Sequence, residues 1–149
     1  MRDMNEDPIG RPLSAEVEGL RLQECWAALA SQTVGGRLAV LGKDGAPDIF
    51  PINYLVHDER IYLRSAPGGA KLVDIVRDAR VAFEVDAIAD GIAWSVVIRG
   101  MAARLDTDDE IVASGVHDLV SANPTAKYNY VRIDPREIMG GRRFRVRAD

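Results

Sequence analysis

The chain has 149 residues, of which 47% are hydrophobic and 28% are charged, and its formal net charge is −4. This length and composition predict one globular domain that buries its own core. The negative charge argues against nucleic acid as a partner, because neutralisation of phosphates supplies most of that affinity. One cysteine and two histidines provide neither an intramolecular disulfide nor a zinc cluster. Without an apolar run of bilayer length or an apolar signal core, we expect a cytoplasmic protein with no membrane partner.

The first segment, residues 1–12, combines charges, glycine and prolines without periodicity, which is typical of a flexible arm. We expect the domain itself to occupy residues 13–149. A helix is predicted to begin at Ser14 and to end at the glycines of TVGG. The apolar residues that share one face of this helix at helical spacing are Leu13, Val17, Leu20, Cys25, Ala28 and Leu29.

Strand patterns follow from residue 37 onward. Residues 37–56 contain two apolar runs joined by the turn-rich GKDGAP, and HDER predicts the next turn. IYLRS predicts a third strand, which is followed by a short helix over Lys71–Val76. RVAFEV predicts a fourth strand, and DAIADGI is expected to form an acidic loop.

The second half continues with a long strand, AWSVVIRGMAARL, in which Gly100 marks a bulge or a close approach. A helix is predicted over Thr107–Ala122, with Thr107 and Glu110 as a capping box. YVRI and RRFRV are expected as separate late strands. The connections between the early strands are too short for βαβ crossovers, which favours a small antiparallel barrel or curled sheet.

The stretch RSAPGGAK lies between the third strand and the short helix. Its glycines, Gly68 and Gly69, leave room for a ligand, and Lys71 starts a helix whose free N–H groups favour an anion. Arg64 and Ser65 add donors at the end of the strand. A phosphate site and a solvated strand-to-helix turn are both compatible with these residues.

Two further stretches carry candidate ligand contacts. Pro51 cannot donate to a sheet ladder, so FPIN predicts an edge or irregularity near Asn53 where backbone groups are able to face a ligand. In WSVVIRG, Trp94 either packs on the core or stacks on a flat ligand, whereas Ser95 and Arg99 occupy the opposite face. An ordinary edge strand and a buried tryptophan remain the alternatives.

The other reactive side chains lack a catalytic setting. Cys25 is expected to be a small buried hydrophobe, and His57 and His117 are expected on the surface. No serine lies in a nucleophile elbow. The basic C-terminal cluster, which could meet an anion or an acidic surface, consists of Arg142, Arg143, Arg145 and Arg147.

Taken in order, the run from GRLAVLGKDG to RSAPGGAKL, RVAFEVD and WSVVIRGMAARL resembles the pyridoxamine 5′-phosphate oxidase-like family of flavin-binding split β-barrels. The likeness covers about residues 34–105 and is closest to the small actinobacterial members. It implies a mainly β, α+β fold: a six-stranded antiparallel split β-barrel with flanking helices. It also implies a homodimer that holds flavin mononucleotide (FMN) in clefts at the interface.

The resemblance also implies a cofactor role for particular residues. Those expected beside the flavin ring are Pro51, Ile52, Asn53, Trp94 and Ser95. Those expected at the ribityl phosphate are Arg64, Ser65 and Lys71.

The chain departs from the true oxidases at three points. Ala70 precedes Lys71 where they have two basic residues, Ser95 replaces a glutamine, and GGRRFRVRAD lacks their substrate-binding motif. The resemblance implies an FMN-dependent oxidoreductase that passes hydride or electrons to a small organic substrate, and the departures argue against pyridoxamine 5′-phosphate as that substrate. The alternatives are a reductase that uses the deazaflavin F420, and a non-enzymatic carrier or sensor of flavin or haem.

Overall fold

The computed structural model describes residues 17–65, 70–119 and 129–145. The expected N-terminal arm, residues 1–12, therefore lies outside the described residues. The strands are β1 (Val17–Gly19), β2 (Gly36–Leu41), β3 (Pro47–Ile52), β4 (Tyr54–His57), β5 (Arg60–Ser65), β6 (Arg80–Ala89), β7 (Ile92–Arg104) and β8 (Asn129–Arg145). The helices are α1 (Leu22–Ala30), α2 (Ala70–Arg77), α3 (Asp108–Ser114) and the 3-10 turn η1 (Val116–Asp118).

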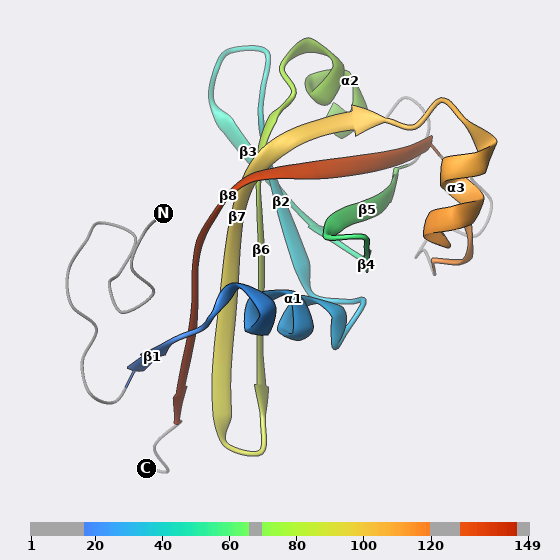
Figure 1. Cartoon of the computed structure of the whole chain (residues 1–149). Helices are drawn as coiled ribbons and strands as arrows, with labels where there is room; N and C mark the ends of the chain where they lie inside the picture. Colours follow the sequence, from blue (N-terminus) through green and yellow to red (C-terminus); the bar gives the residue numbers. More distant parts are fainter. Residues whose placement is uncertain (1–16, 66–69, 120–128, 146–149) are drawn as a thin grey trace.

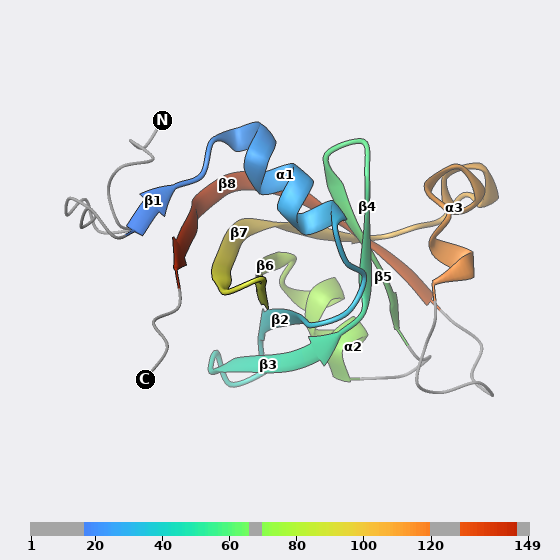
Figure 2. The same ribbon diagram turned by 90° about the horizontal axis from the view of Figure 1, so that it is seen from below.

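The strands form one antiparallel sheet that curls back on itself. Its order is β3-β2-β6-β7-β8-β5-β4, with β1 added to β8. The two end strands, β3 and β4, are consecutive in the chain and are separated by Asn53 alone, so the curl brings the two ends of the sheet together there (Figure 2). The expected antiparallel split barrel with flanking helices is confirmed. The described sheet has eight strands instead of six because β1 joins it and Asn53 divides one run into two.

The inside of the barrel is an apolar core built by period-two strands. Phe83 and Val85 on β6 are 1% and 0% exposed, and the Phe83 ring meets the Tyr54 ring edge-on at 5.1 Å. Helix α1 covers this core with Cys25 and Leu29, and the Tyr54 hydroxyl donates a 2.6 Å hydrogen bond to the Leu29 carbonyl. This bond satisfies the polar end of a fully buried tyrosine.

A second, smaller core lies between β5 and the α3–η1 region, away from α1 (Figure 1). It is formed by Tyr62, Leu105, Val116 and Leu119, with Ile111 and Tyr130 packed at its margin. No helix in the described parts of the chain is long and apolar enough to cross a membrane.

Several local predictions are confirmed. GKDGAP joins β2 to β3, and the second hairpin turns at Asp58 and Glu59, which both have positive φ. Helix α2 covers the expected short helix. Gly100 is a point of close approach, because a Cβ there would lie 2.5 Å from the Asp134 carbonyl oxygen, and the β7–β8 register shifts beside it.

The helix predicted from Ser14 is confirmed over Leu22–Ala30, but its predicted start is wrong in the described residues. Val17–Gly19 form a strand because they pair with β8, and the helix begins only at Leu22. Between them, the Leu20 N–H donates to the Gly141 carbonyl at 2.7 Å, which fixes the chain against β8. Backbone pairing with a distant strand has overridden a helical pattern of side chains.

The predicted acidic loop and the two separate late strands are also wrong. β6 continues to Ala89, and only Asp90 and Gly91 turn, both with positive φ as a tight hairpin requires. The late strands are one strand, β8, because it pairs with β7 over almost its whole length, through register shifts that absorb the irregularity near Pro135.

The predicted helix over Thr107–Ala122 is shorter in the described residues. It ends at Ser114 because Gly115 takes a left-handed conformation, with φ of 77°. The expected capping box is absent: Thr107 makes no side-chain cap, and the Glu110 carboxylate instead contacts Arg132. Residues 120–122 of this prediction lie outside the described residues.

Candidate functional site

The barrel closes where β3 ends and β4 begins, beside the end of β5, and this junction is called the seam. Three of the predicted cofactor residues lie along it. Pro51 is exposed on the edge strand β3, Ile52 is half-buried against the core, and Asn53 joins β3 to β4. Because Tyr54 pairs with Leu63, Asn53 comes next to the end of β5. The irregular chain at Asn53 is the kind of strand interruption that the proline predicted.

The end of β5 supplies two polar side chains at this seam. Arg64 follows Leu63 and is half-buried, and its Nη1 donates a hydrogen bond to the Leu119 carbonyl. Ser65, the next residue, is only 4% exposed. The register therefore brings the backbones of Asn53, Arg64 and Ser65 together. Because neighbouring strand residues point to opposite faces, Ser65 lies on the face of Leu63 and the barrel core. Arg64 lies on the other face, that of Tyr62 and Leu119.

Four residues separate the end of β5 from the start of helix α2, which has Lys71 in its first turn. The glycines at 68 and 69 lie outside the described residues. Arg77, in the last turn of α2, donates a 2.8 Å hydrogen bond to the Leu41 carbonyl and pairs with Asp74 at 2.9 Å. These contacts fasten the C-terminal end of α2 to the end of β2.

The remaining two predicted residues lie apart from this group within one chain. Trp94 packs against the barrel core, and Ser95 is opposite Asp86 on β6 and Arg142 on β8. Strands β2 and β6 separate β7 from the seam at β3, a path of about 14 Å at ordinary strand spacing.

Ion pairs occupy the outer face between the two groups. Arg37, opposite Pro51 on β2, contacts Glu84 at 2.5 Å and Asp86 at 2.9 Å. Asp86 is also opposite Ser95 on β7. The ion pairs on β2 and β6 therefore lie between Ser95 and the seam at β3.

The described residues offer no evident nucleophile or metal centre. Burial, with the Glu24 charge as a smaller cause, raises the pKa of the Cys25 thiol to about 11, so the reactive thiolate is suppressed at neutral pH. His57 and His117 are exposed, as predicted. No group of three or more metal-ligating side chains is found in the described ranges. The chemistry of the seam is therefore that of hydrogen-bond donors.

That donor chemistry fits an anion. Arg64 carries a planar fork of N–H groups, Ser65 a hydroxyl, and α2 the first-turn N–H groups that have no partner within the helix itself. Charge-assisted bonds of this kind are the ones that proteins use for phosphate. The phosphate interpretation of RSAPGGAK is thus compatible with the placement of its described residues, and the individual contacts stay predictions.

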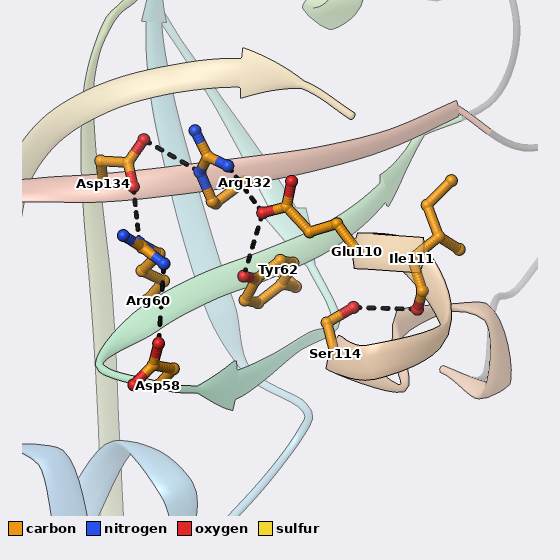
Figure 3. A network of polar contacts seen from close by, with 8 residues as sticks. All are labelled: Asp58, Arg60, Tyr62, Glu110, Ile111, Ser114, Arg132 and Asp134. Carbon is orange, nitrogen blue, oxygen red and sulfur yellow. Dashed lines mark hydrogen bonds and ion pairs between the residues drawn. The ribbon is translucent and has the colours of Figure 1, made fainter. Parts of the chain in front are cut away.

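A polar network near the seam was not foreseen from the sequence. Glu110 on α3 contacts Arg132 on β8 at 2.6 Å and accepts a 3.4 Å hydrogen bond from the Tyr62 hydroxyl (Figure 3). Arg132 also contacts Asp134, which contacts Arg60 at 2.9 Å. Burial, and secondarily the Glu110 charge, raises the pKa of Tyr62. Glu110 and its partners on β5 and β8 are far apart in sequence, so no local spacing of residues predicts these contacts.

The curled antiparallel sheet with flanking helices places the chain among the split β-barrels, and comparison with known proteins identifies the family. Residues 21–142 match the family model described as pyridoxamine 5′-phosphate oxidase, and the chain belongs to this family. The resemblance inferred from the sequence is therefore confirmed.

Proteins similar to this chain include members from Corynebacterium and Mycobacterium. A candidate pyridoxamine 5′-phosphate oxidase of Corynebacterium glutamicum is 40% identical, with a TM-score of 0.77 over 92% of this chain and 99% of that one. The FAD binding protein from Mycobacterium smegmatis is 30% identical, with a TM-score of 0.70 over 85% and 98%. The uncharacterized protein Rv3129 of Mycobacterium tuberculosis is 37% identical over 93 residues, or 61% of this chain and 81% of its own.

Proposed function

We propose that the protein is a flavin-binding oxidoreductase that holds the phosphate of FMN between the end of β5 and the start of α2. The observation that carries this proposal is the convergence of Asn53, Arg64 and Ser65 at the seam, beside the N-terminus of α2. The 30% identical protein of Mycobacterium smegmatis, which is described as FAD-binding, supports a flavin as the ligand.

Each element would have a separate task in this site. Arg64 and Lys71 neutralise the phosphate charge, Ser65 donates a hydrogen bond, and the first turn of α2 adds backbone N–H groups. Pro51 to Asn53 present backbone groups to the polar edge of the ring. The bound flavin would supply the hydride or electron transfer, and the chain supplies position and electrostatics.

We also propose that the working form is a homodimer. Several large apolar side chains are exposed in one subunit, which is typical of an interaction surface. Those on β3, α2 and β6 are Ile49, Val73, Val76 and Ile88, which are 57% to 73% exposed. A second copy would cover such residues and would complete a cleft in which Trp94 and Ser95 contribute to the flavin site.

The substrate class follows from the same residues. Ala70 beside Lys71 leaves one cation fewer at the phosphate, and Ser95 has a shorter reach than a glutamine. We therefore propose a small organic acceptor other than pyridoxamine 5′-phosphate as the partner of the flavin.

The decisive experiment is a visible spectrum of the purified protein with and without added FMN. We expect flavin bands that shift on binding, and mass analysis of the released chromophore identifies FMN or FAD. A colourless preparation that binds no flavin at micromolar concentration would refute the proposal. Competition of FMN with F420, and a Soret band on haem addition, test the alternative ligands directly.

A pair of matched variants tests the phosphate contact. Lys71→Ala should weaken FMN binding by about 1–3 kcal/mol, because it removes a charge-assisted bond. Lys43→Ala, in the exposed turn between β2 and β3, removes the same charge away from the seam and should leave the affinity unchanged. Equal affinities for both variants would show that Lys71 does not contact the phosphate.

A further inference from the structure

The segment formed by α3, η1 and Leu119, residues 108–119, is called here the α3–η1 arm. It holds the side chain of Arg64, because the Arg64 Nη1 donates a hydrogen bond to the Leu119 carbonyl. A guanidinium group is planar and rigid, so fixing one of its nitrogens sets the direction of the whole fork. The orientation of Arg64 therefore depends on a backbone oxygen that is 55 residues away in the sequence.

The Leu119 carbonyl is itself fixed by the small core beneath the arm. Leu119 is 7% exposed and packs with Tyr62, Leu105 and Val116. Its N–H also donates to the Val116 carbonyl at 3.1 Å. The carbonyl cannot move far unless the arm moves with it.

Helix α3 needs outside support to stay in place. It has only seven residues, which is too short for a helix to be stable alone in water. Ser114 is its one buried residue, and Val112 is 65% exposed, so little apolar area holds it. Apart from Ile111, which packs at the margin of the small core, its attachment is polar, through Glu110.

Glu110 links α3 to the sheet through two strands. Its carboxylate meets Arg132 on β8 at 2.6 Å and the Tyr62 hydroxyl on β5 at 3.4 Å (Figure 3). Arg132 is opposite Tyr62 in the β5–β8 ladder and is also held by Asp134 at 3.0 Å. The pair is about three-quarters shielded at Arg132, which is 25% exposed, so solvent screens it less than an ordinary surface pair.

We propose that Glu110 and Arg132 are positioning residues for phosphate recognition: they hold the α3–η1 arm so that the Leu119 carbonyl aims Arg64 at the phosphate of the flavin. This inference rests on the proposed function and deepens it. Neither residue touches the ligand. Their effect passes through the arm to Arg64, so it concerns the phosphate end of the ligand and leaves the ring end unaffected.

The test compares two ligands that differ only in the phosphate, FMN and riboflavin. Glu110→Gln keeps the shape of the side chain and removes its charge, and it should weaken FMN binding about three- to tenfold while riboflavin binding changes less than about twofold. The matched control is Asp109→Asn, which removes the same charge from the same exposed turn of α3 and should change neither affinity. Both affinities are measured by flavin fluorescence titration of the folded protein.

A second measurement asks whether Glu110 acts through Arg64. In an Arg64→Met background the arm has no guanidinium to aim, so Glu110→Gln should add less than about twofold to the loss of FMN affinity. Additive losses would overturn the proposal. So would equal losses of FMN and riboflavin, or a Glu110→Gln protein that binds FMN like the wild type.

The proposed function can fail separately from this inference. Wild-type protein that binds neither ligand refutes flavin binding, and the role of Glu110 in phosphate recognition falls with it. Wild-type protein that prefers FMN, together with an unaffected Glu110→Gln variant, refutes the positioning role alone.

Discussion

The barrel interior and the α3–η1 arm are held by different physical means. In the barrel, strands with alternating apolar residues exclude water, and Val85, Val96 and Ile98 are completely buried. The arm packs on a core of four buried residues, two of them its own, and is fastened by a network of charges that remains partly exposed. The barrel therefore provides most of the folding free energy, whereas the arm determines where a few polar groups point.

This difference predicts different responses to mutation and to solvent. Burial of apolar area contributes about 25 cal/mol per Å² and is not weakened by moderate salt. Partly exposed ion pairs contribute about 1 kcal/mol or less and are screened by salt. A variant in the barrel should thus destabilise the protein strongly, and a variant in the arm should leave its stability almost unchanged while it alters the site.

The largest effect is expected for Phe83→Ala in the barrel. The side chain is 1% exposed and packs edge-on against Tyr54, so its removal should lower the free energy of unfolding by about 3–5 kcal/mol. Val112→Ala, at an exposed position on α3, should change it by less than about 0.5 kcal/mol. Urea denaturation measures the free energy of unfolding of both variants. Equal destabilisation by the two substitutions would contradict the difference between barrel and arm.

The next effect concerns Gly100 on β7, which lies beside the register shift between β7 and β8. A Cβ at this position would lie 2.5 Å from the Asp134 carbonyl oxygen, so Gly100→Ala must push β7 and β8 apart and should cost about 1–3 kcal/mol. Gly45→Asn is a suitable control, because that turn is open and asparagine tolerates its positive φ of 81°. A Gly100→Ala protein as stable as this control would show that the strands separate without strain.

The barrel could be predicted from the sequence to a large extent, because its signals are local. Alternation in IYLRS and turn residues in GKDGAP are properties of neighbouring residues, and they placed β5 and the β2–β3 hairpin correctly. The position of Gly100 within the long strand likewise predicted the close approach of β8.

The arm and the ends of the chain could not be predicted in this way. Val17 belongs to a strand only because β8 lies beside it, and Glu110 binds Arg132 across the fold where a local capping box was expected. The candidate site shows the same division: Arg64 and Ser65 could be named from their strand, but the Leu119 carbonyl that orients Arg64 lies in a distant segment.

A third effect is expected from Cys25 at alkaline pH. Burial and the smaller influence of Glu24 raise the pKa of its thiol from the ordinary 9.0 to about 11. Because the folded state holds the proton more tightly, this stability is fully present below pH 9 and is lost as the pH rises through 11. The loss should reach about 1 kcal/mol at pH 10. Cys25→Ala should lack this pH-dependent loss of stability. The check is the free energy of unfolding of both proteins between pH 8 and pH 10, and parallel curves would show that the thiol of Cys25 does not cause the loss.

The smallest effect on stability is expected in the polar network, and it distinguishes the arm from the barrel most clearly. Glu110→Gln and Arg132→Met should each cost about 1 kcal/mol or less, because Arg132 keeps Asp134 when Glu110 is neutralised. A double-mutant cycle should give a coupling free energy of about 0.5–1 kcal/mol that declines between low and high salt. The cost of Phe83→Ala should stay constant over the same range of salt. If the coupling between Glu110 and Arg132 were equally insensitive to salt, the pair would be held by packing, and the arm would be an extension of the barrel core.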